Sequence, residues 1–560
     1  MAVDSRSILW RSWAIILCLT GVRASALPQT GTALPATIPV GAYRIAGTII
    51  SKIDRRPLAQ ARVTIRDAKD PQKFEFVITS EDGKYEFRGV PPGKYSLTGA
   101  KRGFISASYD QHDQYSTAIV TGAGFDTETL VLRLAPDAVI TGKVLDEAND
   151  PVRQATVSLY YDDHSSGVDH IRQFRSAQTN DLGEYELTPL MPGTYFLSAS
   201  GKPWYAVHPH LDSTQSASEP AENPPPIDRS LDVAYPTTYY PGVTEADDAM
   251  PIPIRGGERL EADIHLNPVP SLRLLFRVPD NGTHGYNFPQ LEQSAFDGST
   301  FIQSSGLNVV SPGVMEITGI PAGRYNLHLN TAAGTVLMNG VDLTRDGEEI
   351  DASKSEATSS VKFSVRIAGA TTLPEHLSVG LRSGNRIITA SQAVDAKGEA
   401  ELQQVAAGRY EVLIFGPGTP YSVAHMSSEG AQVAGRALSV TAGSSPSVSL
   451  TLAAGSAEIQ GTVTRAGRGF AGAMVVLVPK DPELGRDRFR RDQSDLDGTF
   501  ALRGVIPGSY TLLAIENGWD LDWSQPGVIA AYLKRGWKIE VGDQSARPLT
   551  IEQPIELQSK

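Results

Sequence analysis

The chain has 560 residues, of which 20% are charged and 41% hydrophobic, and its formal net charge is −13. That length is too great for one compact core, and the ordinary composition excludes wholesale disorder, so we expect several globular domains. The acidic balance argues against nucleic acid and anionic membrane surfaces as partners, because a phosphate-binding protein needs a basic face.

Residues 1–26 have the pattern of a secretory signal. Arg6 and Arg11 precede the apolar run WAIILCLTGV, and small residues stand at 24–26. We expect cleavage near Ala26 and export to the periplasm, the outer surface or the medium. No later stretch reaches the run of about 20 apolar residues that a membrane-spanning helix needs.

The single cysteine, Cys18, lies within this apolar run. Leu17 precedes it where a bacterial lipoprotein signal carries a small residue, so no lipid anchor is expected. After cleavage the chain would contain no disulfide and no cysteine-ligated metal.

A stretch rich in glycine and proline, DGKYEFRGVPPGKYSL at 82–97, predicts a strand, a Pro-Gly turn and a second strand. Clear copies stand at 182–197 and 497–512, and weaker ones at 312–327 and 397–412. In each copy two glycines stand ten residues apart and a tyrosine follows two residues after the second glycine. These positions are Gly83, Gly93 and Tyr95; Gly183, Gly193 and Tyr195; Gly313, Gly323 and Tyr325; Gly398, Gly408 and Tyr410; and Gly498, Gly508 and Tyr510.

We interpret the repeated tyrosine as structural, with its ring buried between two sheets and its hydroxyl bonded to backbone. The alternative is a ligand-binding tyrosine that recurs in every copy.

A second pattern precedes the strong copies, at 46–65, 141–159 and 460–477, and predicts a strand, a polar hairpin and a strand. Each repeat then has four or more short strands and little helical periodicity. The predicted fold class is all-β, a tandem array of about five small antiparallel, immunoglobulin-like or transthyretin-like sandwiches. After a linker at 27–41, the expected units are 42–136, 137–268, 269–355, 356–455 and 456–560.

The run from G-x-V/I through A-x-V-x-L/I and G-x-Y-x-F/L to P-G-x-Y-x-L resembles the carboxypeptidase regulatory-like domain. The resemblance covers about 45–140, 138–200 and 456–515. In the third and fourth units only the spacing of the motif recurs, and the leading G-x-V is lost or blurred. It implies a transthyretin-like β-sandwich, as in large secreted repeat proteins of bacteria. The motif is structural, so the resemblance carries over no catalytic residue.

Signatures of catalysis are missing from the sequence. None of the 10 histidines is followed by Glu three residues later, and there is no Gly-x-Ser-x-Gly or phosphate-binding Gly-x-x-x-x-Gly-Lys motif. We therefore predict that the protein is not an enzyme and uses no cofactor. The alternative that stays open is an active site in which two carboxylates from distant strands meet as general acid and base.

The stretch at about 200–258 departs from the repeat pattern and is rich in aromatic residues and proline. We interpret it as an insertion that decorates the second unit. Its candidate ligand-binding residues, which suit polysaccharide or a cell-surface protein, are Trp204, Tyr205, Tyr235, Tyr239 and Tyr240. The alternative is that these rings anchor the insertion to its own sandwich.

Two further groups of residues are weaker candidates. The sequence DDH at 162–164, with His170, His208 and His210, could ligate a metal, but we interpret it as a solvated hairpin and expect no metal. The tail after the last core strand carries Trp519, Trp523, Tyr532 and Trp537. We expect these rings to cap the last sandwich, and keep the three tryptophans as a secondary binding candidate.

Two classes of function follow from the sequence. The first is a non-catalytic, secreted or envelope-associated repeat protein that binds carbohydrate or a surface protein. The second is a structural spacer or accessory subunit with no site for a small ligand.

Overall fold

The computed structural model describes residues 42–210, 228–277, 289–331, 334–351, 358–383, 386–387, 391–483, 485–542 and 547–560. The expected signal at 1–26 and linker at 27–41 lie outside these residues. In the described part, the strands form ten sheets, which pair into five β-sandwiches. We call these sandwiches units 1 to 5 in chain order.

Unit 1 shows the plan that the other units repeat. In one sheet, β1 (Tyr43–Ser51) pairs antiparallel with β4 (Lys84–Val90) and parallel with β8 (Leu130–Leu134). In the other, β2 (Arg62–Asp67) lies between β3 (Phe74–Ile78) and β5 (Gly93–Ala100), and β5 also pairs with β6 (Ala107–Ser108) and β7 (Ile119–Thr121). The turn between β4 and β5 carries the chain from one sheet to the other.

The remaining elements follow in chain order. Unit 2 contains β9 (Ala138–Leu145), β10 (Thr156–Asp163), β11 (His170–Gln178), β12 (Glu184–Leu190), β13 (Gly193–Ser200), η1 (Arg229–Leu231), β15 (Thr238–Tyr239), η2 (Ala246–Asp248), β16 (Ile252–Ile254), β17 (Arg259–Glu261) and β18 (Ile264–His265). Unit 3 contains β14 (Val233–Ala234), β19 (Val269–Arg277), β20 (Gln290–Ala295), β21 (Gly298–Ile302), β22 (Gly306–Ser311), β23 (Val314–Pro321), β24 (Gly323–Thr331), β25 (Gly334–Leu343) and β26 (Glu348–Asp351). Unit 4 contains β27 (Ser359–Ile367), β28 (Ser378–Ser383), β29 (Arg386–Ile387), β30 (Gln392–Ala393), β31 (Glu399–Val405), β32 (Gly408–Phe415), β33 (Tyr421–Glu429), β34 (Gln432–Ala434), β35 (Ala437–Val440) and β36 (Ser447–Ala454). Unit 5 contains β37 (Ala457–Arg465), β38 (Arg468–Gly469), β39 (Met474–Pro479), η4 (Arg486–Arg488), β40 (Arg490–Gln493), β41 (Thr499–Val505), β42 (Gly508–Ile515), η5 (Gly518–Asp520), α1 (Pro526–Leu533), β43 (Trp537–Val541), β44 (Leu549–Thr550) and β45 (Ile555–Glu556).

Units 3 and 4 share the plan of unit 1 although their sequences match the motif weakly. In each, the first long strand (β19 or β27) pairs antiparallel with the strand before the repeated turn and parallel with a later strand. The sandwiches are therefore mostly antiparallel, with a parallel neighbour beside the first strand of every unit.

The repeated tyrosines occupy the same place in all five units. Each ring is buried, and each hydroxyl donates a hydrogen bond to the carbonyl four residues earlier, across the turn that links the two sheets. The five bonds are Tyr95 to Pro91 (3.1 Å), Tyr195 to Met191 (2.8 Å), Tyr325 to Pro321 (2.7 Å), Tyr410 to Ala406 (2.8 Å) and Tyr510 to Ile506 (2.6 Å). The bond gives the carbonyl at the turn a hydrogen-bond donor, so it fixes the connection between the sheets.

The glycine of the G-x-V/I pattern is explained by the parallel neighbour. A Cβ on Gly47 would overlap the carbonyl oxygen of Leu130, and one on Gly142 would overlap that of Ala262. Tyr185 then lies over Gly142 and donates its hydroxyl to the same Ala262 oxygen. Only glycine allows the last strand and the tyrosine to approach this closely.

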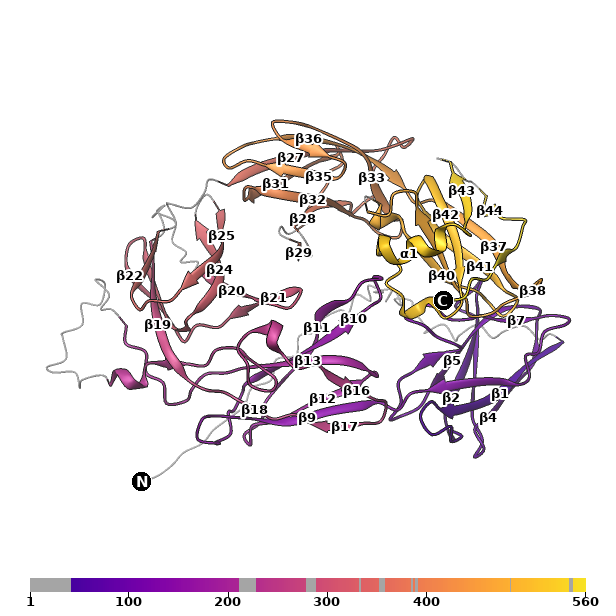
Figure 1. The fold of residues 1–560 in the computed structure, drawn as a ribbon, viewed down its shortest axis with the longest axis horizontal. Coiled ribbons are helices and arrows are strands. Elements are labelled where there is room, and N and C mark those ends of the chain that lie inside the picture. Colours follow the sequence, from indigo (N-terminus) through magenta and orange to yellow (C-terminus); the bar gives the residue numbers. More distant parts are fainter. Residues whose placement is uncertain are drawn as a thin grey trace, which may run out of the picture.

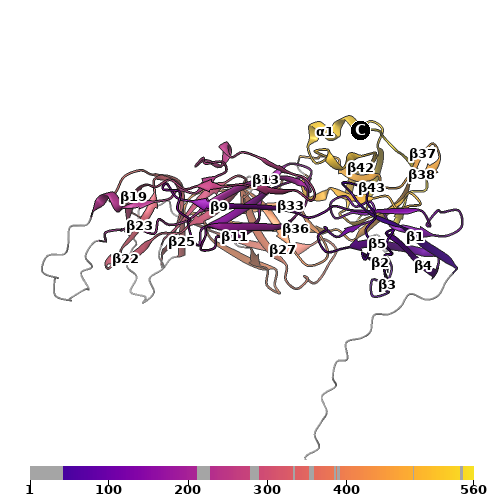
Figure 2. The ribbon, with the colours of Figure 1, turned by 90° about the horizontal axis from the view of Figure 1, so that it is seen from below.

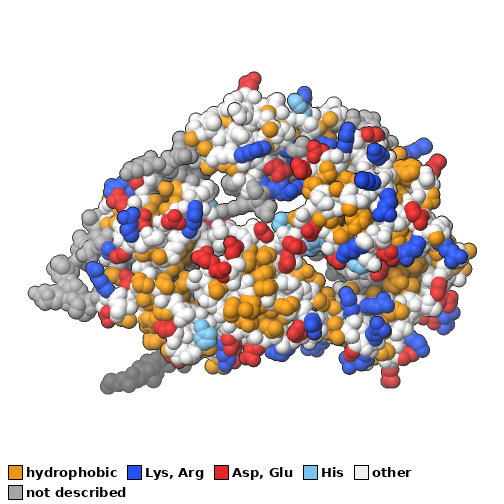
Figure 3. All heavy atoms as spheres, viewed as in Figure 1, with side chains coloured by type: hydrophobic (Ala, Val, Ile, Leu, Met, Phe, Trp, Pro, Cys, Tyr) orange, Lys and Arg blue, Asp and Glu red, His pale blue; other side chains and the backbone are white. Residues whose placement is uncertain are grey.

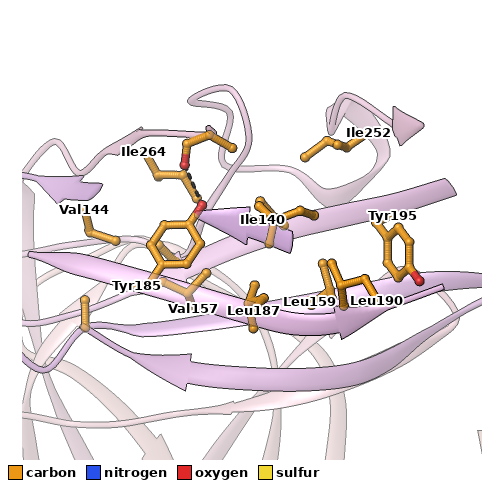
Figure 4. Close-up of a cluster of buried hydrophobic side chains, with 14 of the residues drawn as sticks. Ile140, Val144, Val157, Leu159, Tyr185, Leu187, Leu190, Tyr195, Ile252 and Ile264 are labelled. Carbon is orange, nitrogen blue, oxygen red and sulfur yellow. Dashed lines mark hydrogen bonds between the residues drawn. The ribbon is translucent and has the colours of Figure 1, made fainter. Parts of the chain in front are cut away.

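Figure 4 shows the core of unit 2. Apolar side chains from both sheets, such as Ile140 and Val157, alternate inward and are fully buried. Tyr185 and Tyr195 enter the same core at different points along the strands.

The insertion at 200–258 belongs to two units. β15 and β16 pair with β13 in unit 2, whereas β14 pairs with β19 in unit 3. The insertion therefore contributes strands to two sandwiches and connects them. The sequence led us to expect an insertion that belongs to unit 2 alone.

The five units are arranged in a ring, with unit 5 against units 1 and 2 (Figure 1). Seen edge on, the ring is thin, with α1 on one side of it (Figure 2). No helix within the described residues is both long and apolar enough to cross a membrane.

Candidate functional site

The aromatic residues of the insertion do not form one exposed face. Trp204 is 85% exposed, but Tyr235 and Tyr239 are 6% and 1% exposed. Tyr205 is half-buried, and Tyr240 packs against the core of unit 2. Of the five candidate residues, Trp204 is exposed and Tyr205 and Tyr240 are partly exposed, and a ligand role for them stays a prediction.

Glu147 holds the start and end of the insertion together. Its carboxylate accepts hydrogen bonds from the hydroxyls of Tyr205 and Tyr235. Burial works to raise the pKa of Glu147, but these hydroxyls outweigh it and leave the pKa below its ordinary value. Burial beside this carboxylate raises the pKa of Tyr205 to about 12. Tyr235 thus anchors the insertion.

Tyr239 is covered by unit 3. Its ring lies 5.6 Å from that of Phe296, edge to face, and Phe296 also contacts Tyr160 (4.9 Å) and Phe196 (5.0 Å) of unit 2. These contacts join the two sandwiches, so the ring of Tyr239 serves the interface between units 2 and 3.

The histidines of the insertion also face unit 3. His208 Nδ1 lies 2.8 Å from Asp232 and 3.4 Å from Ser271, and His210 Nδ1 lies 3.2 Å from Glu316. They do not join His164 in a metal-ligand cluster among the described residues.

The tryptophans of the tail contact other units. Trp519 stacks on His112 of unit 1, with ring centroids 5.0 Å apart and an angle of 7°. Trp523 is 7% exposed, and a Cβ on Gly167 of unit 2 would lie 2.5 Å from its ring. Trp537 is 39% exposed at the start of β43. Trp519 and Trp523 therefore form an interface between units.

Arg491 lies at the meeting point of units 1, 2 and 5. Its guanidinium sits 4.3 Å from the ring centroid of Trp523 and also approaches Tyr115 and Trp519. It donates hydrogen bonds to Asp113 in unit 1 (3.1 Å) and to the Ser165 carbonyl in unit 2 (2.8 Å). Its side chain is only 5% exposed. Arginine suits this place because its planar charge stacks on rings while it donates at its edge.

A polar seam continues the contact between units 1 and 5. Gln493 donates to the Asp110 carbonyl (2.6 Å) and to Thr117 Oγ1 (2.8 Å). Lys94 pairs with Asp495 at 2.5 Å. Burial raises the pKa of Asp495 despite this partner. The seam closes the ring with specific, directional bonds.

A cleft of about 970 Å³ runs along this junction. The edge strand β40 contributes Arg490, Arg491 and Asp492 to its lining. Its lining includes Lys69, Lys94, Tyr115, Arg490, Arg491 and Arg503. Within the described residues, Arg490 Nη2 and Arg491 Nη1 are buried and have no hydrogen-bond partner. These two nitrogens lie beneath the surface of the cleft, and the cations that the lining presents to solvent include Lys69 and Arg503, with the ring of Tyr115 in the same lining.

Asp492 also lines the cleft. It accepts a hydrogen bond from the Ala501 amide at 2.7 Å, and burial raises its pKa to about 6. Because Asp492 is held by β41 and Asp495 by Lys94, each carboxylate already has a structural partner. Sequence reasoning missed this site since its residues come from units far apart along the chain.

Residues 44–134 match the family model of the carboxypeptidase regulatory-like domain. Comparison with curated proteins finds no match. Among solved structures, the chain is similar to a streptococcal ancillary pilin at 12% identity, over 51% of this chain and 98% of that one, with a TM-score of 0.20. A minor pilin of Streptococcus agalactiae matches at 13% identity, over 41% of this chain and 97% of that one, with a TM-score of 0.21. The TIE protein of Bacillus anthracis matches at 10% identity, over 74% and 73%, with a TM-score of 0.16. Matches at these identities and scores say nothing about function.

Proposed function

We propose that the protein is a non-catalytic, secreted or envelope-associated binding protein, and that it takes up carbohydrate in the cleft between units 1 and 5. The observation that carries this proposal is the lining of the cleft, where the exposed side chains of Lys69 and Arg503 stand with the partly exposed ring of Tyr115. Exposed guanidinium and ammonium groups only donate hydrogen bonds, so this lining favours an acceptor-rich ligand.

The rest of the lining agrees with a sugar ligand. Tyr115 supplies an aromatic ring, and Gln460 and Thr462 supply side chains that both donate and accept hydrogen bonds. Sugar hydroxyls and carboxylates are acceptors that such groups recognise. The charge pattern does not suit nucleic acid, since basic and acidic side chains are mixed over the face in Figure 3.

The absence of catalysis is part of the proposal. The two partly buried carboxylates of the cleft, Asp492 and Asp495, are engaged by Ala501 and Lys94, and neither faces a nucleophile signature in the sequence. The secreted location rests on the signal pattern at 1–26.

A glycan array with the chain from residue 27 onward tests the proposal. Two substitutions in the lining, Arg503→Ala and Gln460→Ala, should each weaken binding. Neither residue takes part in the seam described above, so the ring should stay closed. Arg88→Ala is the matched control, because Arg88 is an exposed arginine of unit 1 outside the cleft.

The alternatives give different results on the same array. Binding that is lost only in Trp204→Ala would move the site to the insertion. If the protein binds no glycan but captures a defined surface protein, the partner is a surface protein. If it binds neither, the result favours a structural spacer. Turnover in a glycosidase or peptidase screen, abolished by one Asp or Glu substitution, would overturn the non-catalytic assignment.

A further inference from the structure

The hairpin between β10 and β11 places three metal-ligating side chains together with the help of unit 5. His164 and Asp169 stand at the two ends of this hairpin, and Asp522 follows η5 in unit 5. One ligand atom of each lies within 4.8 Å of the other two. His164 Nδ1 is 2.6 Å from Asp169 Oδ1 and 3.6 Å from Asp522 Oδ1.

The backbone fixes the orientation of the imidazole. His164 Nε2 lies 2.8 Å from the carbonyl oxygen of Leu521. A carbonyl only accepts, so Nε2 carries a hydrogen, and Nδ1, which faces the two carboxylates, is the atom that holds either a proton or a metal ion. Metal-ligating histidines are commonly held in this way, by donating the other ring nitrogen to a carbonyl. A second bond, from the Ser524 amide to the Gly167 carbonyl at 3.3 Å, holds the hairpin in register with the tail.

The surrounding charges leave this spot negative. Arg172 pairs with Asp163, Lys560 with Asp520, and Arg491 with Asp113. None of these cations bonds to Asp169 or Asp522 in the described structure. Asp162, on β10 two residues before His164, has a buried Oδ1 with no hydrogen-bond partner among the described residues. A cation beside Nδ1 would compensate the charges of Asp169 and Asp522.

We propose that His164, Asp169 and Asp522 bind a divalent transition-metal ion, with Zn²⁺ as the best fit, and that this ion ties unit 2 to unit 5. The donor set of one imidazole and carboxylates suits zinc better than calcium or magnesium, which prefer all-oxygen ligands. Ligands about 2.0 Å from a tetrahedral zinc lie about 3.3 Å apart, so each side chain needs to move by less than about 1 Å. The sequence alone led us to expect a solvated hairpin here, because Asp522 is remote in the chain.

Isothermal titration of the chelator-treated chain, from residue 27 onward, with ZnCl₂ tests the site. We expect one Zn²⁺ per chain, and an affinity at least about tenfold weaker in each of His164→Gln, Asp169→Asn and Asp522→Asn. Asp181→Asn is the matched control, since Asp181 is an exposed aspartate of the same unit that pairs with Arg153. Its affinity should equal that of the unchanged protein. Circular dichroism and a melting curve in chelator establish that every variant is folded.

Three results would overturn the proposal. The first is no zinc binding by the unchanged protein, which would leave a protonated His164 paired with Asp169. The second is a zinc affinity of Asp522→Asn equal to that of the unchanged protein, which would show that the ion does not bridge units 2 and 5. The third is binding of CaCl₂ as tight as that of ZnCl₂, which would show that the imidazole is not a ligand. None of these measurements involves a glycan, so the outcome is independent of the proposed carbohydrate site.

Discussion

Replacing Arg491 with alanine is expected to loosen the contact that closes the ring. The side chain is 5% exposed and touches units 1 and 2 from its place in unit 5. Its removal deletes the stacking on Trp523 and two charged hydrogen bonds. It also leaves Asp113 without its partner.

The size of the effect follows from these contacts. Removing one partner of a buried ion pair costs about 3 to 5 kcal/mol, and a desolvated cation–π contact is worth about 2 kcal/mol. These values overlap because one side chain supplies both contacts. Asp113 is 33% exposed and regains water, which favours the lower end of the range. We therefore expect closure to weaken by about 3 kcal/mol, or about a hundredfold in the equilibrium constant.

Energy transfer between two dyes measures closure directly. Cys18 is the only cysteine, and it lies before residue 27. Cysteines introduced at the exposed positions Glu81, in unit 1, and Arg468, in unit 5, therefore carry the labels without interference. Transfer is recorded against urea concentration. The substitution should shift the loss of transfer to lower urea, ahead of unfolding of the separate sandwiches.

Two controls sharpen the result. Arg491→Lys keeps the charge but loses the planar stacking and the forked donor geometry, so it should fall between the unchanged protein and the alanine variant. Arg503→Ala removes an exposed arginine from the same unit and should open as the unchanged protein does. If Arg491→Ala opens at the same urea concentration as the unchanged protein, Arg491 does not carry the closure.

Three further predictions concern the separate units. Asp492→Asn should stabilise unit 5 above pH 6: the raised pKa of Asp492, about 6, means that the folded state keeps its proton while the unfolded state loses it near its ordinary pKa of 3.8. The cost of ionised Asp492 to the stability of unit 5 therefore grows between about pH 4 and pH 6 and reaches about 3 kcal/mol. The difference in the free energy of unfolding between the variant and the unchanged protein, measured in urea melts, should grow over the same range and vanish at lower pH. Tyr195→Phe, which deletes one buried hydrogen bond, should destabilise unit 2 by about 1 kcal/mol, and Tyr195→Ala by at least about 3 kcal/mol. Amide hydrogen exchange should become faster in unit 2, and an equal acceleration in unit 4 would contradict a local role. Limited proteolysis should cut between units, and one indivisible core would contradict the proposed boundaries near 136, 269, 355 and 455.

The sequence predicted the repeated fold because the signals of that fold are local. The turn, its glycines and Tyr195 lie within sixteen residues, 182–197, and the hydroxyl of Tyr195 bonds four residues back. The same spacing located units 3 and 4, where the rest of the motif has faded. Strand alternation and turn chemistry act over such short distances whatever the neighbouring domains do.

The candidate sites could not be predicted in this way. The insertion offered five aromatic residues, but Phe296 covers Tyr239 from unit 3 and Glu147 holds Tyr235. The tryptophans of the tail looked like a cap, and Trp519 turned out to stack on a residue of unit 1. Which side of a ring meets solvent depends on how the sandwiches pack, and no local pattern encodes that.

By itself, the sequence determined the all-β repeat and the turn that each tyrosine fixes. The tertiary structure alone decided that the array closes on itself, and therefore that Arg491 reaches Asp113 and that His164 reaches Asp522. The physical reason is distance along the chain. Periodicity and turn propensity describe residues a few positions apart, whereas these contacts join units 2 and 5 or 1 and 5, whose meeting depends on the accumulated orientation of every sandwich between them.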